Sequence, residues 1–132
     1  MRLALDTNRY ADLQRGDPAV VHTLRHAAEI YLPLIVLGEL PAGFLGGNRA
    51  AANEQILATF LSTPGVHVLA PDDETTRHYA TLVNQLRQQA TPIPTNDLWI
   101  AALVIQLQSR ALHARRAFRS HLTTAPTVTR FK

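Results

Sequence analysis

Short apolar segments alternate with longer amphipathic ones along the chain, and this alternation constrains the fold more than any other feature. An apolar period of two, or a short unbroken apolar run, predicts a strand, whereas apolar residues three and four apart predict a helix. The predicted strands are Arg2–Asp6, Ile30–Leu32, Val66–Leu69, Ala111–Ala114 and Thr127–Phe131. Strands that alternate with helices form a parallel sheet wrapped by helices. The sequence therefore predicts an α/β fold.

Five helices are predicted between these strands. Asp17 as N-cap and Pro18 at the first helical position start one helix, and Asp72 caps a long amphipathic helix to Gln89. The other predicted helices are Pro33–Leu45, Asn48–Phe60 and Leu98–Leu107, of which the last is apolar nearly all round. The segment between Asp6 and Asp17 is expected to be a polar turn.

The composition bounds the class of protein. The chain has 132 residues, 46% hydrophobic and 17% charged, which suits a single globular domain over residues 1–132. Because cysteine is absent, disulfides, zinc–thiolate sites and thiol nucleophiles are excluded. Asp6 interrupts the apolar start, and the longest apolar run, Ile30–Gly38, is too short to span a bilayer. We expect a cytoplasmic protein without membrane contact.

The charges are unevenly distributed along the chain. All ten acidic residues lie at or before Asp97, together with seven of the thirteen basic residues. After Asp97 the chain holds six basic residues and no acidic side chain. The C-terminal part therefore carries the whole basic excess.

Three carboxylates stand in apolar segments, where an unpaired charge is costly. Asp6 ends the first predicted strand, Glu39 lies inside LIVLGELPAGFL, and Asp97 begins DLWIAALVI. In parallel sheets, ligands bind beyond the carboxyl ends of the strands, which is where Asp6 is expected. Such desolvated carboxylates need a cation, and Mg²⁺ or Mn²⁺ prefers hard oxygen ligands of this kind. The neighbouring hydroxyl and amide side chains are Thr7, Asn8, Thr95 and Asn96.

Each carboxylate also has a purely structural interpretation. Asp97 could be an acid favoured by the dipole of a helix first turn. Glu39 could face solvent on a half-buried helix, and Asp6 could cap the next helical turn. The joint placement of the three acids near element ends favours a shared site over three independent structural roles.

Three segments of the chain resemble the signature segments of PIN-domain ribonucleases of the VapC toxin type. They are Leu5-Asp6-Thr7-Asn8, Val36-Leu37-Gly38-Glu39-Leu40 and Pro94-Thr95-Asn96-Asp97-Leu98-Trp99-Ile100-Ala101-Ala102. The third segment is the most specific, and the resemblance extends over the whole chain in length and in the order of elements. A single LDTN motif would be weak, whereas three motifs in order are strong.

The resemblance implies a three-layer α/β/α sandwich with a short, mainly parallel twisted sheet, a homodimer and an acidic pocket for Mg²⁺ or Mn²⁺. In that family the metal activates a water that attacks an RNA phosphodiester. Asp6 and Asp97 match the metal-binding positions, and Glu39 matches the acid that orients or deprotonates the water. Supporting hydroxyls match Thr7 and Thr95, and amides near the pocket match Asn8 and Asn96.

One position departs from the family pattern. Family members usually carry a fourth acid in a turn after the fourth strand, and a gapless continuation places Arg115 at that position. Two interpretations follow. In the first, three acids suffice for catalysis, and the basic residues Arg115, Arg116 and Arg119 contact the phosphates of RNA. In the second, the domain is catalytically impaired and acts as an RNA- or antitoxin-binding module.

A pure interaction module is the third alternative. The apolar stretch Leu34–Leu45 and the helix after Asn48 could form a groove for an amphipathic partner helix. For a VapC-like toxin the partner implied by the resemblance is a cognate VapB-like antitoxin. His22 and His26 lie one helical turn apart, but no third ligand accompanies them, so a hydrated helix face is the favoured interpretation.

Overall fold

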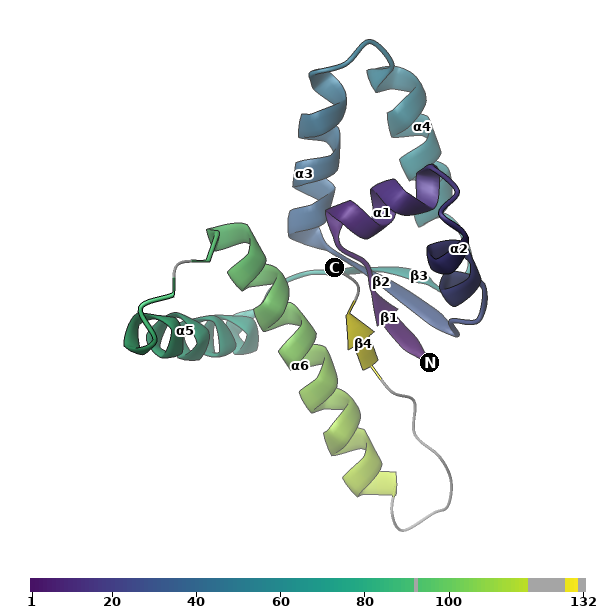
Figure 1. The fold of residues 1–132 in the computed structure, drawn as a ribbon. Coiled ribbons are helices and arrows are strands. Elements are labelled where there is room, and N and C mark those ends of the chain that lie inside the picture. The colour runs from purple at the N-terminus through teal and green to yellow at the C-terminus, as the bar shows by residue number, and fades with distance from the viewer. Residues whose placement is uncertain (92, 119–127, 131–132) are drawn as a thin grey trace. The chain divides into compact units, whose positions relative to one another are not determined.

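A computed structural model of the chain describes residues 1–91, 93–118 and 128–130, with side chains described up to residue 112 (Figure 1). The chain divides into two units. The first holds Met1–Leu69 and the end of the last strand, and the second begins at Ala70 and holds the last two helices. The first unit is built around a sheet, and the second is built from two helices.

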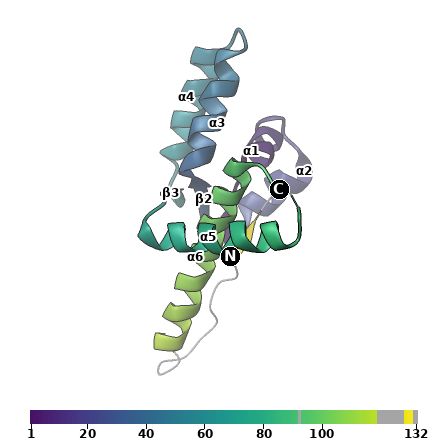
Figure 2. The same ribbon diagram turned by 90° about the vertical axis from the view of Figure 1, so that its left-hand side faces the viewer.

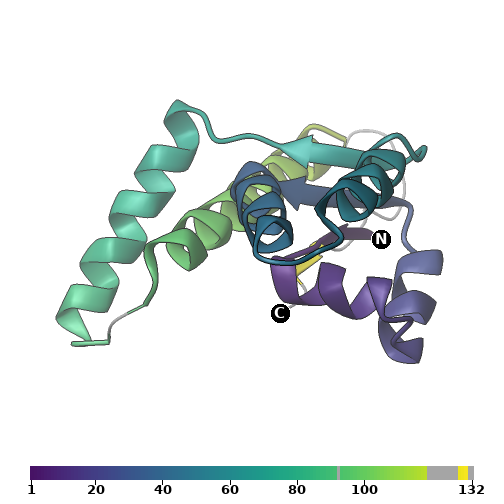
Figure 3. The same ribbon diagram turned by 90° about the horizontal axis from the view of Figure 1, so that it is seen from above.

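The strands are β1 (Arg2–Ala4), β2 (Glu29–Pro33), β3 (Val66–Leu69) and β4 (Val128–Arg130). They form one sheet in the order β3-β2-β1-β4. β1 pairs with β2 and β2 with β3 in parallel, so that Leu3 lies opposite Ile30 and Leu32 opposite Val68. Figure 3 shows β1, β2 and β3 side by side. The predicted parallel sheet is therefore confirmed for these three strands.

Four helices complete the first unit: α1 (Thr7–Gln14), α2 (Pro18–Arg25), α3 (Leu34–Leu45) and α4 (Ala50–Leu61). α2 begins as predicted, because the Asp17 side chain accepts hydrogen bonds from two backbone N–H groups and Pro18 follows it. α3 and α4 run side by side as a hairpin (Figures 1 and 2). The predicted bounds of α3 and α4 agree with the structure to within two residues.

The prediction of a polar turn after Asp6 is wrong, because residues 7–14 form the helix α1. The helix buries one side chain, Tyr10, and therefore lacks the apolar stripe by which a helix is recognised in a sequence. It is stabilised instead by Asp6, whose carboxylate caps it, and by an edge-to-face contact of the Tyr10 and Phe60 rings at 5.6 Å. The helical conformation of this segment therefore depends on tertiary packing and not on an apolar pattern in its own sequence.

The core of the first unit lies where β1 and β2 meet the helices. Leu3, Leu5, Leu32 and Val36 are fully buried there. Burial of a side chain of this size contributes about 1.5–3 kcal/mol. Because Leu5 immediately precedes Asp6, this packing holds the carboxyl end of β1 in place.

The second unit consists of α5 (Asp73–Gln88) and α6 (Thr95–Phe118), which cross each other (Figure 2). α5 begins as predicted, with Asp72 and Thr75 forming a reciprocal capping box. The prediction of a strand at Ala111–Ala114 is wrong, because these residues continue the helix α6. Alanine and leucine, which make up three of the four residues, are strong helix formers, and no glycine or proline interrupts the segment.

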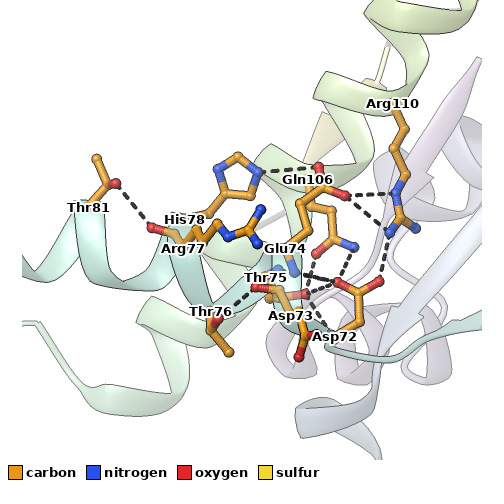
Figure 4. Close-up of polar contacts among 10 residues, drawn as sticks. All are labelled: Asp72, Asp73, Glu74, Thr75, Thr76, Arg77, His78, Thr81, Gln106 and Arg110. Carbon is orange, nitrogen blue, oxygen red and sulfur yellow. Dashed lines mark hydrogen bonds and ion pairs between the residues drawn. The ribbon is translucent and has the colours of Figure 1, made fainter.

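Polar contacts, shown in Figure 4, and an aromatic contact attach α6 to the N-terminal half of α5. Gln106 accepts a hydrogen bond from the Thr75 hydroxyl and donates one to Asp72 Oδ1 at 3.1 Å. Arg110 donates to Asp72 Oδ2 at 2.7 Å and to Glu74 Oε2 at 3.2 Å. Nearer the start of α6, the Trp99 ring stacks on Tyr79 with centroids 3.9 Å apart.

The Arg110 contact changes the titration of Asp72. The hydrogen bond from the Arg110 guanidinium is the main reason that the pKa of Asp72 is lowered, and backbone N–H groups of α5 add to it. A carboxyl group whose pKa is lower in the folded protein stabilises the fold at a pH above its pKa in the unfolded state, about 3.9. This contribution to stability is lost as the pH falls through the pKa in the folded state.

Within the part of the chain that the structure describes, no helix is long and apolar enough to cross a membrane.

We predict that Ala90→Gly stabilises the protein. Ala90 has a φ of 52°, a left-handed conformation that costs a residue with a Cβ about 1–2 kcal/mol. It follows α5 in a Schellman turn, in which the Thr91 N–H donates to the Leu86 carbonyl at 3.1 Å. Because glycine adopts this conformation freely but loses more chain entropy on folding, the expected net gain is about 0.5–1 kcal/mol. Urea denaturation measures it, and an unchanged or lower free energy of unfolding would contradict the strain.

We also predict a pH-dependent effect of Arg110→Met. The substitution raises the folded-state pKa of Asp72, so the free energy of unfolding should fall most above about pH 5 and converge with wild type towards about pH 2. Arg77→Met removes an exposed arginine of α5 that has no ion pair among the described side chains, and serves as the matched control. Denaturant titrations across this pH range give the comparison. A difference independent of pH would rule out the Asp72 contact as its source.

Candidate functional site

Asp6 lies directly beyond the carboxyl end of β1. Leu5 extends the pairing with β2, since its N–H donates to the Tyr31 carbonyl at 2.9 Å, and the chain then turns into α1. Asp6 Oδ1 accepts a hydrogen bond from the backbone N–H of Arg9 at 2.9 Å. Asp6 therefore caps α1, as its purely structural interpretation expected. Its half-buried carboxylate also lies at the strand end where the sequence predicted a ligand-binding residue.

Glu39 is brought to the same place by Thr7. Glu39 lies in the middle of α3 and is half-buried, and the Thr7 hydroxyl donates to its Oε1 at 3.1 Å. Because Thr7 adjoins Asp6 in the chain, this contact links the segments of two predicted acidic residues that are far apart in sequence. Glu39 is thus partly exposed, as its structural interpretation allowed, and it also makes a tertiary hydrogen bond.

Neither Asp6 nor Glu39 forms an ion pair with any side chain that the structure describes. Two half-buried carboxylates without a cation and one hydroxyl form a set of hard oxygen donors. Such a set suits a small divalent cation such as Mg²⁺ or Mn²⁺ better than a soft metal, which prefers sulfur or imidazole. The donor chemistry of this part of the chain therefore fits the expected metal.

Asp97 belongs to the second unit. It is exposed in the first turn of α6, next to the exposed side chains of Thr95 and Asn96. Asn8 is exposed on α1 and has no hydrogen bond among the described side chains. The structure thus brings together Asp6, Thr7 and Glu39 within one unit. Among the described residues, no group of three acidic or histidine side chains is close enough to hold a metal ion.

The arginines of the C-terminal part do not follow the expected strand and turn. Arg115 and Arg116 lie on the last turns of α6, where the sequence predicted residues just beyond a fourth strand. Their side chains are outside the described part, and Arg119 lies wholly outside the described residues. The prediction that the three arginines contact phosphate stays a prediction.

A groove in the first unit lies between α1, α3 and α4. It has a volume of about 430 Å³, with Tyr10, Leu40, Phe44 and Ile56 contributing its apolar wall. Arg15 and Arg49 contribute positive charge to its lining, and Arg15 is paired with Asp12. The groove expected from Leu34–Leu45 and the helix after Asn48 is therefore present, with α1 as an additional wall that the sequence did not predict.

Two other features bear on the interpretation of the sequence: one agrees with it and one was missed. His22 and His26 contact each other at the end of α2, with ring centroids 4.4 Å apart and no third ligand among the described residues, which agrees with the hydrated-face interpretation. The cluster of Asp72, Thr75 and Gln106 was missed. Its signal in the sequence was Gln106, a polar residue inside the otherwise apolar segment LVIQL.

Comparisons with known proteins extend these observations. The chain matches the PIN domain family over residues 3–120. Ribonuclease VapC1 of Haemophilus influenzae (strain R2866) is 32% identical over 109 residues, which cover 80% of each chain. The structure of VapBC2 from Rickettsia felis bound to a promoter DNA fragment aligns with a TM-score of 0.71 and 28% identity, over 80% of this chain and 81% of that one.

VapBC-1 from nontypeable Haemophilus influenzae aligns with a TM-score of 0.72 and 27% identity, over 82% of both chains. These likenesses confirm the predicted α/β fold class with a mainly parallel sheet. The family match begins in β1 and runs through all three signature segments, so the resemblance found in the sequence is confirmed. The chain therefore belongs to the PIN-domain family, with VapC ribonucleases among its relatives.

Proposed function

We propose that this protein is a metal-dependent endoribonuclease toxin that cleaves RNA phosphodiesters and is neutralised by a cognate VapB-like antitoxin. The observation that carries the proposal is a pair of half-buried carboxylates without an ion pair among the described side chains: Asp6, and Glu39, which is hydrogen-bonded to the hydroxyl of the residue that follows Asp6, Thr7. The relatives named ribonuclease VapC support the reaction class, and the matched VapBC structures support the partner. The family match spans both units without a break, which supports a single PIN-like domain over residues 1–132.

In this proposal Asp6 and Asp97 hold the divalent ion, Mg²⁺ or Mn²⁺, and Glu39 orients or deprotonates the attacking water. When bound, the ion lowers the pKa of water and offsets the charge that develops on the phosphate oxygens. Thr7 donates to Glu39 Oε1, which leaves Oε2 to orient the water and accept its proton. The hydrogen bond also fixes the Glu39 rotamer before substrate arrives, so little reorganisation is needed during the reaction.

Thr95, Asn8 and Asn96 are proposed as supporting polar groups at the rim of the site. Arg115, Arg116 and Arg119 are proposed to contact the phosphate backbone of the RNA, since guanidinium groups bind phosphate oxygens in pairs. The alternative is a catalytically impaired domain that binds RNA or antitoxin without cleaving, because Arg115 replaces the fourth acid of the family pattern. A homodimer and a cytoplasmic location stay predictions.

We predict that Asp6→Asn and Asp97→Asn each lower the rate of RNA cleavage by at least about a hundredfold, because each removes a charged ligand of the ion. The measurement is cleavage of a panel of labelled hairpin and single-stranded RNAs with Mg²⁺ or Mn²⁺, with and without EDTA. Asp73→Asn and Glu54→Gln remove exposed acids of α5 and α4 and should leave the rate unchanged. Cleavage that survives EDTA or both site substitutions would contradict the metal mechanism. Wild-type protein that binds RNA without cutting any of it would favour the impaired module.

The groove between α1, α3 and α4 is proposed as the docking site of an amphipathic antitoxin helix. Its apolar wall suits the apolar face of such a helix, and Arg49 forms no ion pair among the described residues, so it can meet an acidic side chain of the partner.

We predict that Phe44→Ala weakens binding of the small protein encoded beside this gene by at least about tenfold, because a buried aromatic anchor is lost from the interface. Titration calorimetry of the purified pair gives the dissociation constant. Leu112→Ser, which changes an exposed apolar residue of α6 outside the groove, is the matched control and should bind like wild type. Equal affinity of the Phe44→Ala variant would place the antitoxin elsewhere.

A further inference from the structure

We propose that Gln106 is a positioning residue that sets the register of α6 against α5 and thereby the place of Asp97. The inference rests on the proposed function, because it assigns to Gln106 a role in presenting a carboxylate that the proposed function places in the site. It concerns the second unit alone, in which both helices and all the contacts that carry the argument lie.

Thr75 and Gln106 are the buried polar residues among the side chains that the structure describes, and both are fully buried. They meet between the two helices, where Gln106 Oε1 accepts from the Thr75 hydroxyl (Figure 4). The other end of the same amide, Nε2, donates to Asp72 Oδ1 at 3.1 Å. Both ends of the Gln106 side chain are therefore used, and each is matched to the N-terminal turn of α5.

The apolar residues of α6 do not define this register by themselves. The large buried apolar side chains are spaced three and four apart and form one face of this part of the helix: Ile100, Leu103, Val104 and Leu107. At 100° per residue, Gln106 lies beside the small buried Ala102 and away from that face. A helix of this kind can pack in positions that differ by one turn with little loss of apolar contact, since ridges and grooves repeat along its length. Gln106 distinguishes these positions, because a buried amide away from Thr75 and Asp72 would lose its partners.

The consequence reaches Asp97 through a continuous helix. Asp97 lies nine residues before Gln106 in α6, a separation of about 13.5 Å along the helix axis. A slip of one turn would move Asp97 by about 5.4 Å. Because metal–oxygen ligand distances are only about 2.0–2.6 Å, such a slip would carry Asp97 out of reach of an ion that it would otherwise hold.

Two further contacts agree with this role. Arg110, one turn beyond Gln106, donates to the other oxygen of Asp72, so two residues of α6 contact the same N-cap residue. Trp99, two residues after Asp97, stacks on Tyr79 of α5. The register set at Gln106 is thus held at both ends of the contact between the helices.

A substitution that removes the amide without emptying the space separates register from stability. In Gln106→Leu the volume is nearly kept, and the Thr75 hydroxyl keeps an acceptor, since it lies 3.4 Å from Asp72 Oδ1. We therefore expect an unchanged or higher midpoint of thermal unfolding, together with a loss of register. Leu103→Ala is the matched control, because it removes a buried apolar side chain of the same helix and lowers the unfolding midpoint while Gln106 remains.

Register is measured directly with spin labels. The chain has no cysteine, so Asn84→Cys in α5 and Gln108→Cys in α6, both at exposed positions, give one labelled pair. We expect a single narrow distance in the wild-type background and in Leu103→Ala. In Gln106→Leu we expect a broadened distribution or a second distance, shifted by about 5 Å. An unchanged distribution in Gln106→Leu overturns the proposal, whatever the activity of that variant.

Activity and metal binding test the link to Asp97. At a temperature well below unfolding, Gln106→Leu should lower kcat by about ten- to a hundredfold with little change in KM, and should weaken Mn²⁺ binding in calorimetry. Leu103→Ala should keep kcat and Mn²⁺ affinity. Suppose that Gln106→Leu shifts the register but keeps kcat and Mn²⁺ affinity, while Asp97→Asn abolishes cleavage. The proposed effect of Gln106 on Asp97 is then overturned. If Asp97→Asn itself has no effect, the proposed function fails, and the spin-label distances still decide the role of Gln106.

Discussion

The cost of holding carboxylates without a cation is the constraint on which the candidate site depends. Asp6 and Glu39 are half-buried, and no arginine or histidine among the described side chains pairs with them. The fold offsets part of this cost with two hydrogen bonds, one from a backbone N–H of α1 and one from the Thr7 hydroxyl. The remaining carboxylate oxygens form no ion pair among the described side chains, and this uncompensated charge is the physical basis of the proposed metal site.

The two units position their acidic residues by different means. Asp6 and Glu39 are held by packing, because Leu5 is buried directly before Asp6 and Leu40 is buried directly after Glu39. Asp97 is exposed at the start of a helix whose attachment relies on polar and aromatic contacts with α5. Directional contacts of this kind select one arrangement of two helices, whereas apolar contacts are tolerant of small shifts.

Most strands and helices were predictable because their signals are local. The Asp17-Pro18 and Asp72 caps lie within three residues of the N–H groups that they satisfy, and the strand Val66–Leu69 has the expected bounds. The failures also have local causes. α1 has no apolar stripe, and the segment Ala111–Ala114 is apolar enough for a strand although its residues are good helix formers. For α1 the deciding contact, between Tyr10 and Phe60, lies outside the window that a pattern can examine, whereas for Ala111–Ala114 the helix propensities of the residues prevail over the apolar run.

The sequence by itself determined which residues are candidates for chemistry and which family the chain resembles, because three acidic motifs in order are visible without any structure. Only the tertiary structure decided how these residues are supported. The bond from Thr7 to Glu39 joins residues 32 positions apart, and the bond from Thr75 to Gln106 joins residues 31 positions apart. Such pairs depend on how α1 packs on α3 and, separately, α5 on α6, and packing is a property of the folded chain that no local sequence pattern encodes.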